Sequence, residues 1–215
     1  MNRKLKITVI AYDDLINGPS LAQFRFAKSL SKLGYNVELL IAFRFFKNDL
    51  SRFNDEKIKI LNLNKKRTIF LIFPLIKYLL KNKPDVIFSA GDHINLTLLF
   101  SSIVSFSKSK LSLSSRVSPL DAYLNQDKID FNHNAKRKST TMYYLFKMLN
   151  WRADVLTCVS KDMVNDYQKV FGSTKHVPVY NIIKDDDSEK LQNEKITDKW
   201  FLNNKSPIII AAGQM

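Results

Sequence analysis

Side chains that could bind an anion or a hydroxyl group follow three of the predicted strands. Gly18 and Pro19 stand between the first strand and a helix, Asp92 and His93 follow the fourth strand, and Arg116 stands at the end of the fifth. The guanidinium of arginine is a rigid fork that suits phosphate or carboxylate, and histidine can donate, accept or take up a proton near neutral pH. These residues predict a site for a phosphorylated or hydroxyl-bearing ligand. The ordinary alternatives are a capped helix start, a surface histidine and a surface salt bridge.

Two further polar residues, Asn95 and Ser118, stand within a few positions of these side chains. The segment before the first helix holds one glycine instead of the three of a dinucleotide fingerprint, so bound NAD is not expected. Backbone N–H groups at the start of that helix would still attract an anion. No His or Cys cluster has metal-site spacing, and Asp185 and Asp187 stand in a charged run, so no metal is expected.

Strands and helices alternate along the chain, which predicts a parallel sheet with right-handed crossovers. Strands are expected at residues 4–11, 35–42, 57–63, 85–90, 111–117, 154–159 and 175–180, and helices at 20–33, 68–81, 94–107, 136–151 and 161–171. Ser20 and Ser160 are the expected N-caps, and Gly34 and Gly172 the expected stops. The fold class is α/β, a Rossmann-like, doubly wound sheet with both faces covered. Its ligands are expected at the carboxyl ends of the strands.

Composition changes near the end of the chain. Residues 1–183 form the expected Rossmann-like domain, and residues 184–206 are polar and charged, as in a linker. Residues 207–215 begin with Pro207, continue with three isoleucines and reach Gly213, which is typical of a buried strand. We expect this strand to open a second domain whose remainder lies outside the sequence.

The net charge of +14 is concentrated in the first part of the chain. Residues 1–83 hold 17 Lys and Arg against 6 Asp and Glu, and residues 84–215 hold 17 against 14. A basic half predicts an anionic partner, which could be a phosphorylated substrate or a membrane surface in contact with residues 65–83. A Lys-rich composition inherited from an AT-rich genome is the alternative. Nucleic acid is not expected, because no nucleic-acid-binding motif is present.

The sequence predicts a cytoplasmic protein, either soluble or peripheral on the inner face of the plasma membrane. The start of the chain does not have the pattern of a signal peptide, and the most apolar stretch, residues 69–80, is shorter than the ~20 residues of a spanning helix. The single cysteine, Cys158, fits a reducing compartment. It stands in an apolar run, which favours a buried structural thiol.

Five segments, in order along nearly the whole chain, carry a resemblance to family 4 glycosyltransferases. They are Asn-Gly-Pro at 17–19 with residues 27–39, Lys-Pro-Asp-Val-Ile at 83–87, Trp-Arg-Ala-Asp-Val-Leu-Thr-Cys-Val-Ser at 151–160, Val-Pro-Val-Tyr-Asn at 177–181, and residues 208–213. The chain departs from the family where Gly18-Pro19 replaces a glycine pair and Ser20-Leu21 replaces Glu-Arg. It also has Asn181-Ile182 in place of Asn-Pro.

The resemblance implies a GT-B fold, in which two Rossmann-like domains face a cleft. The N-terminal domain receives the acceptor, and the C-terminal domain binds the nucleotide sugar and carries a Glu-x7-Glu motif. The reaction retains anomeric configuration and uses a nucleotide sugar as co-substrate with no cofactor. By this resemblance Gly18 and Pro19 form the donor-phosphate loop and His93 is the catalytic candidate. The implied acceptor-binding residues are Asp92, Asn95, Arg116 and Ser118.

The expected function is transfer of a sugar to a lipid-linked or saccharide acceptor, as in the synthesis of capsule, lipopolysaccharide or another envelope glycolipid. The 215 residues alone are expected to be inactive, because the nucleotide-sugar half is missing from them. A non-catalytic α/β module that binds an anionic membrane or a phosphorylated partner is the alternative.

Overall fold

The computed structural model describes residues 4–13, 18–43, 57–120, 133–172, 175–182, 192–197 and 201. The chain divides into two compact units, residues 1–182 and 183–215. The described part of the second unit is residues 192–197 and 201. The expected strand at 207–215 and most of the expected linker at 184–206 therefore lie outside the described residues. All elements named below belong to the first unit.

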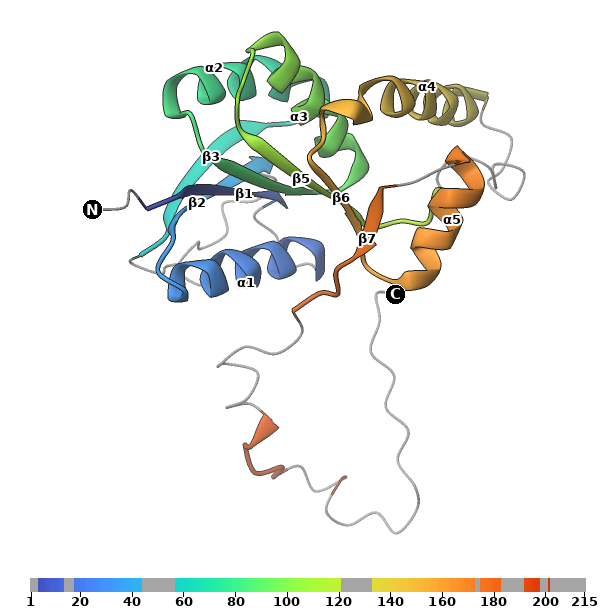
Figure 1. Ribbon diagram of the computed structural model, residues 1–215. Coiled ribbons are helices and arrows are strands. Elements are labelled where there is room, and N and C mark those ends of the chain that lie inside the picture. The colour runs from blue at the N-terminus through green and yellow to red at the C-terminus, as the bar shows by residue number, and fades with distance from the viewer. Residues whose placement is uncertain are drawn as a thin grey trace. The chain divides into compact units, whose positions relative to one another are not determined.

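Seven parallel strands form one sheet in the order β3-β2-β1-β4-β5-β6-β7 (Figure 1). The strands are β1 Lys6–Asp13, β2 Asn36–Phe43, β3 Lys59–Lys65, β4 Val86–Ala90, β5 Lys110–Ser115, β6 Val155–Cys158 and β7 His176–Pro178. The helices are α1 Gly18–Lys32, α2 Ile72–Asn82, α3 Asp92–Val104, α4 His133–Leu149 and α5 Lys161–Phe171, with short 3-10 helices η2 Thr68–Leu71 and η5 Asn150–Arg152. The strand order reverses between β1 and β4, so the predicted doubly wound Rossmann-like sheet is confirmed.

The two faces of the sheet are covered by different helices. On one face, α1 packs on β1 and β2 through a cluster that includes Val9, Leu39 and Phe24. On the opposite face, α2 and α3 pack on the strands through a larger cluster that includes Leu75 and Leu98. Figure 1 shows α1 on one side of the sheet and α2 and α3 on the other.

The sheet is less deeply buried on the α1 face at β5 and β6. In β5, Leu111 and Leu113 are buried against the α3 side, whereas Ser112 and Ser114 are half-buried on the α1 side. Val155 of β6 is 42% exposed. β5 therefore alternates between apolar and polar residues instead of being continuously apolar.

Helix ends follow local chemistry in some places and tertiary contacts in others. The predicted ends of α5 are confirmed: the Ser160 side chain accepts the Met163 N–H at 3.2 Å, and Gly172 has φ +76°. The prediction of Ser20 as an N-cap is wrong, because α1 already begins at Gly18. The helix expected at 94–107 begins two residues earlier, because Gly91 turns the chain at φ +96° and α3 begins at Asp92. Within the described residues, no helix combines the length and apolarity that crossing a bilayer requires.

Candidate functional site

The carboxyl ends of β1, β4 and β5 bring the candidate residues to one edge of the sheet. Asp13 ends β1 and is buried, and its Oδ1 accepts the Ser20 hydroxyl at 2.6 Å. The Asp13 N–H donates in turn to Ser20 Oγ at 3.2 Å. This reciprocal pair fixes the first turn of α1 beside the end of β1. Gly18 and Pro19 are exposed at that edge, which is the place where an anion could meet the helix N-terminus.

Asn95 connects the ends of β4 and β5 from inside the protein. It is fully buried, and its Oδ1 accepts the Ser89 hydroxyl at 2.5 Å while its Nδ2 donates to the Ser114 carbonyl at 3.0 Å. The Gly91 N–H donates to the same Ser114 carbonyl at 3.0 Å. This placement favours a positioning role for Asn95, because its amide is already used in holding α3 to the two strand ends.

Asp92 and His93 occupy the first turn of α3 at the same edge. His93 is exposed and Asp92 is half-buried. A carboxylate in a first helical turn is stabilised by the helix dipole. Burial and the nearby charge of Asp92 raise the pKa of Tyr167, which is fully buried on α5, so this phenol stays neutral. Of these side chains, His93 is the one that solvent and a ligand can reach.

Arg116 follows β5 and is partly buried. Its Nη1 donates a hydrogen bond to Oδ1 of Asn181, in the segment after β7. Its Nε is buried without a hydrogen-bond partner in the structure. Burial lowers the pKa of the Arg116 guanidinium below its usual value, but an arginine remains charged in proteins. The guanidinium therefore keeps donor capacity for an anionic ligand.

Ser118 is engaged with α5. Its hydroxyl donates to Asp166 Oδ2 at 3.0 Å, and its Oγ accepts the Leu120 N–H at 3.3 Å. These bonds favour a role in fixing the segment after β5. The Cys158 thiol is buried, as predicted, and burial raises its pKa, so it remains protonated and is no nucleophile.

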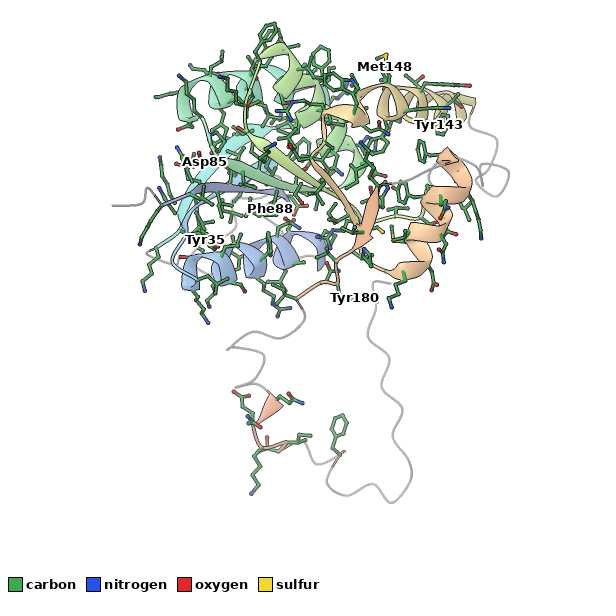
Figure 2. The ribbon with its side chains drawn as sticks, in the orientation of Figure 1. Tyr35, Asp85, Phe88, Tyr143, Met148 and Tyr180 are labelled. Carbon is green, nitrogen blue, oxygen red and sulfur yellow. The ribbon has the colours of Figure 1, made fainter. Side chains whose placement is uncertain are left out.

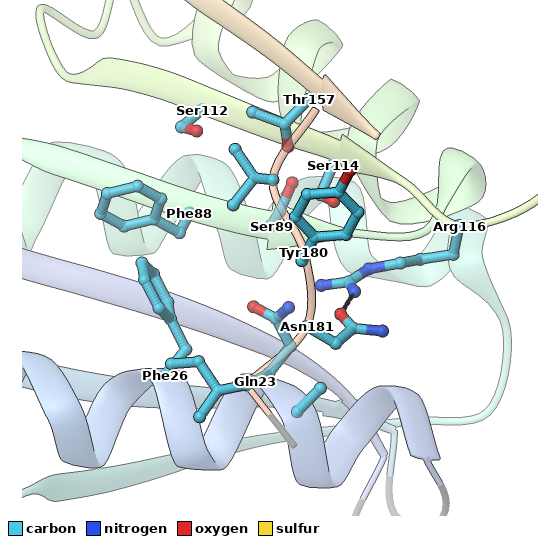
Figure 3. Close-up of a pocket in the computed structure, with 13 residues that line it drawn as sticks. Gln23, Phe26, Phe88, Ser89, Ser112, Ser114, Arg116, Thr157, Tyr180 and Asn181 are labelled. Carbon is cyan, nitrogen blue, oxygen red and sulfur yellow. Dashed lines mark hydrogen bonds between the residues drawn. The ribbon is translucent and has the colours of Figure 1, made fainter. Parts of the chain in front are cut away.

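A pocket of about 110 Å³ lies on the α1 face of the sheet, next to Arg116 (Figure 3). One wall is α1, the floor comes from β4, β5 and β6, and the other wall is the segment of residues 179–182. Its lining residues are Ala22, Gln23, Phe26, Phe88, Ser89, Ser112, Ser114, Arg116, Thr157, Val179, Tyr180, Asn181 and Ile182. Figure 2 shows Phe88 in the layer between the sheet and α1.

The pocket combines three kinds of chemistry. Phe26 and Phe88 meet edge to face with centroids 4.8 Å apart and form an aromatic wall. The floor carries hydroxyl groups from β4, β5 and β6, and Arg116 with Asn181 forms a polar, charged part. The pocket is smaller than the ~300–1,000 Å³ of common small-molecule sites, so it suits one sugar-sized or phosphate-bearing group better than a whole nucleotide.

The sequence predicted Arg116 as a site residue but not three residues that line the pocket with it. Gln23 is buried on α1, while Tyr180 and Asn181 follow the last strand. The signal for Gln23 was a polar residue on the apolar stripe of a helix. Asn181 was noted for its resemblance to a family motif, but its contact with Arg116 depends on the strand order. Among the described residues, no three His, Cys, Asp or Glu side chains gather as metal ligands would.

Solved structures match most of the chain at low sequence identity. HepE of Anabaena in complex with UDP is 13% identical with a TM-score of 0.53, and the match covers 87% of this chain and 49% of HepE. The lipopolysaccharide outer core galactosyltransferase WaaB is 16% identical with a TM-score of 0.56, over 84% of this chain and 46% of WaaB. Sucrose-phosphate synthase of Thermosynechococcus elongatus is 11% identical with a TM-score of 0.57, over 82% and 48%.

At these sequence identities, the matches show similarity of fold. No protein-family model and no curated protein matches the sequence. The chain spans about half the length of the solved structures that it matches. Its seven-stranded parallel sheet with flanking helices is the Rossmann-like α/β fold of GT-B glycosyltransferase domains.

Proposed function

We propose that this chain forms the acceptor-binding half of a GT-B glycosyltransferase that takes a sugar from a nucleotide-sugar donor. One observation carries the proposal: most of this chain matches about half of each of several sugar-transferring enzymes, among them a lipopolysaccharide galactosyltransferase and a sucrose-phosphate synthase. HepE was solved with UDP, which supports a nucleotide sugar as the donor. A cleft between two such halves would place the carboxyl edge of this sheet beside the donor.

Side chains at the carboxyl edge of the sheet support acceptor binding there. Arg116 offers a fixed cationic fork for an acceptor phosphate, and the hydroxyl-lined pocket beside it suits a sugar ring. The exposed His93 is our candidate for a hydrogen bond to a reacting hydroxyl. Asp92 stands next to His93 in the first turn of α3, and Gly18 and Pro19 remain the proposed contact to the donor phosphate.

In more detail, we propose a retaining, family 4-like transferase that uses no cofactor and acts in envelope polysaccharide or glycolipid synthesis. Its acceptor would be lipid-linked or a saccharide, and it would work in the cytoplasm or on the inner face of the plasma membrane. The resemblance of the sequence segments supports this assignment. Stabilising the leaving nucleoside diphosphate is the larger part of such chemistry, and we assign that task to the second, nucleotide-sugar-binding domain of the GT-B architecture.

A transfer assay tests the proposal. The protein translated through the whole reading frame is incubated with labelled nucleotide sugars and a panel of lipid-linked and saccharide acceptors, beside the 215-residue chain. We expect labelled product from the complete protein and none above blank from the chain alone. Turnover by the chain alone would contradict the two-domain assignment. A frame that closes without a second domain would favour the non-catalytic module.

A further inference from the structure

Three large apolar side chains are exposed together where η2 meets α2. Ile69 is 62% exposed, Phe70 56% and Phe73 81%. The apolar face of α2 that packs into the core lies elsewhere on the helix, at Leu75 and Leu79. Exposed apolar side chains that gather on one surface mark an interaction site more often than single ones do.

Basic residues surround this apolar cluster. A groove lined by Lys65, Lys66 and Lys77 runs beside Phe70 and Phe73. Residues 57–84 hold eight lysines and arginines and no aspartate or glutamate, so no acidic residue of this segment neutralises the surface. Apolar side chains rimmed by cations are the combination that anionic bilayers bind, because the apolar groups enter the interface and the cations meet the headgroups.

The fold places this surface at the same edge of the sheet as the candidate site. It follows the end of β3 directly, so it lies at the carboxyl edge of the sheet, as the candidate site does. β3 is three strands from β4, which precedes His93, and four from β5, which precedes Arg116, which corresponds to roughly 14–19 Å across the sheet. A membrane in contact with η2 and the start of α2 would therefore lie beside the edge that carries Arg116 and His93.

We infer that Ile69, Phe70 and Phe73 insert into the interfacial layer of an anionic phospholipid membrane while Lys65, Lys66, Arg67 and Lys77 contact its headgroups. The contact is peripheral and reversible, and salt weakens it because the charges are exposed. It does not depend on the proposed transferase activity. If that activity holds, the contact presents the acceptor side of the site to lipid-linked substrates.

Vesicle sedimentation of the 215-residue chain tests this inference. Vesicles of phosphatidylcholine alone are compared with vesicles that also contain phosphatidylglycerol, at low and high salt. We expect binding that requires phosphatidylglycerol and falls with salt. The double variant Phe70→Ser and Phe73→Ser, and separately Lys66→Glu and Lys77→Glu, should each lower the partition coefficient on the order of tenfold or more.

Matched variants elsewhere control for composition and for folding. Leu33→Ser with Phe106→Ser removes two side chains that are 74% and 90% exposed, and Lys161→Glu with Lys175→Glu makes the same charge change at exposed positions. Both controls should bind like the parent, and all variants should keep the parent's thermal melt. Equal binding to neutral vesicles, no binding, or equal losses in control and patch variants would overturn the inference. So would tight binding of a single-stranded oligonucleotide that needs the lysines but not the phenylalanines.

Discussion

Arg116 and Asn181 stand 65 positions apart in the chain and are joined by a hydrogen bond from Nη1 of the arginine to Oδ1 of the asparagine. The bond ties the end of β5 to the segment after β7 and orients the guanidinium beside the pocket. The Nε of Arg116 is buried without a hydrogen-bond partner. In the acceptor site that we propose, Arg116 therefore binds the acceptor and Asn181 positions the Arg116 side chain.

Asn181→Ala tests the positioning role. Without its partner the Arg116 side chain gains rotamer freedom, so the acceptor KM of the complete enzyme should rise several-fold while the donor KM stays near the parent value. Asn181 is exposed, so unfolding stability should change by less than about 0.5 kcal/mol. Acceptor and donor kinetics, measured beside a thermal melt, separate these effects. A rise in the donor KM alone would indicate that Asn181 contributes to donor binding and not to acceptor binding.

His93→Ala should lower kcat/KM by about 10- to 100-fold if His93 contacts a reacting hydroxyl. The side chain is exposed at the start of α3, so the melt should be unchanged. His133 lies in another helix, α4, and His133→Ala serves as a matched control in the same assay. Parent-like kinetics of His93→Ala would remove His93 from the site.

Asn95→Ala should destabilise the fold by about 2 kcal/mol, because the buried Ser89 hydroxyl and the Ser114 carbonyl lose hydrogen bonds to the amide. Urea unfolding measures the loss. Asn36→Ala, at an exposed position, should stay within about 0.5 kcal/mol of the parent. If Asn95→Ala kept the parent's stability but impaired acceptor use, Asn95 would be assigned to direct contact with the ligand instead.

The buried carboxylate of Glu38, near the start of β2 and away from the candidate site, predicts that acid lowers the stability of the fold. Burial alone would raise the pKa of Glu38, but hydrogen bonds from Tyr78 at 2.6 Å and Lys59 at 3.2 Å, with the charge of Lys6, lower it below its usual 4.5. A lowered folded-state pKa means that the charged form stabilises the fold above the unfolded value. This stabilisation is lost as the pH falls through the folded value.

Glu38→Gln should therefore reduce the unfolding free energy at neutral pH and make it less dependent on pH below about 4.5. Urea unfolding at neutral pH and at about pH 3 compares the two regimes. Glu194→Gln removes an exposed carboxylate and should leave the parent's pH dependence intact. An unchanged acid response in Glu38→Gln would show that other groups carry it.

The fold was predictable because its signals are local. Apolar runs that alternate with helical patterns give the parallel sheet, and Ser160 and Gly172 mark the ends of α5 through bonds and backbone angles within a few residues. The start of α1 was not predictable in this way. Ser20 there serves the carboxylate of Asp13 rather than its own helix, and that pairing depends on how β1 and α1 meet.

The candidate site was predictable only by its position. Arg116 follows a strand, and strand ends of a parallel sheet meet at one edge, so its place at the site could be inferred. Its partner Asn181 and the buried Gln23 come from distant segments, and the strand order brings them together. Asp92 and His93 were expected before the helix at 94–107, whereas the chain turns at Gly91 with a positive φ and α3 already begins at Asp92, with Asn95 buried on the helix.

Arg116→Lys in the complete enzyme tests the central claim that this chain binds the acceptor. Lysine keeps the charge but cannot reproduce the two-pronged geometry, so we predict an acceptor KM raised by about tenfold or more, with the donor KM and the thermal melt near parent values. A raised donor KM with an unchanged acceptor KM, or parent-like values for both, would contradict the claim.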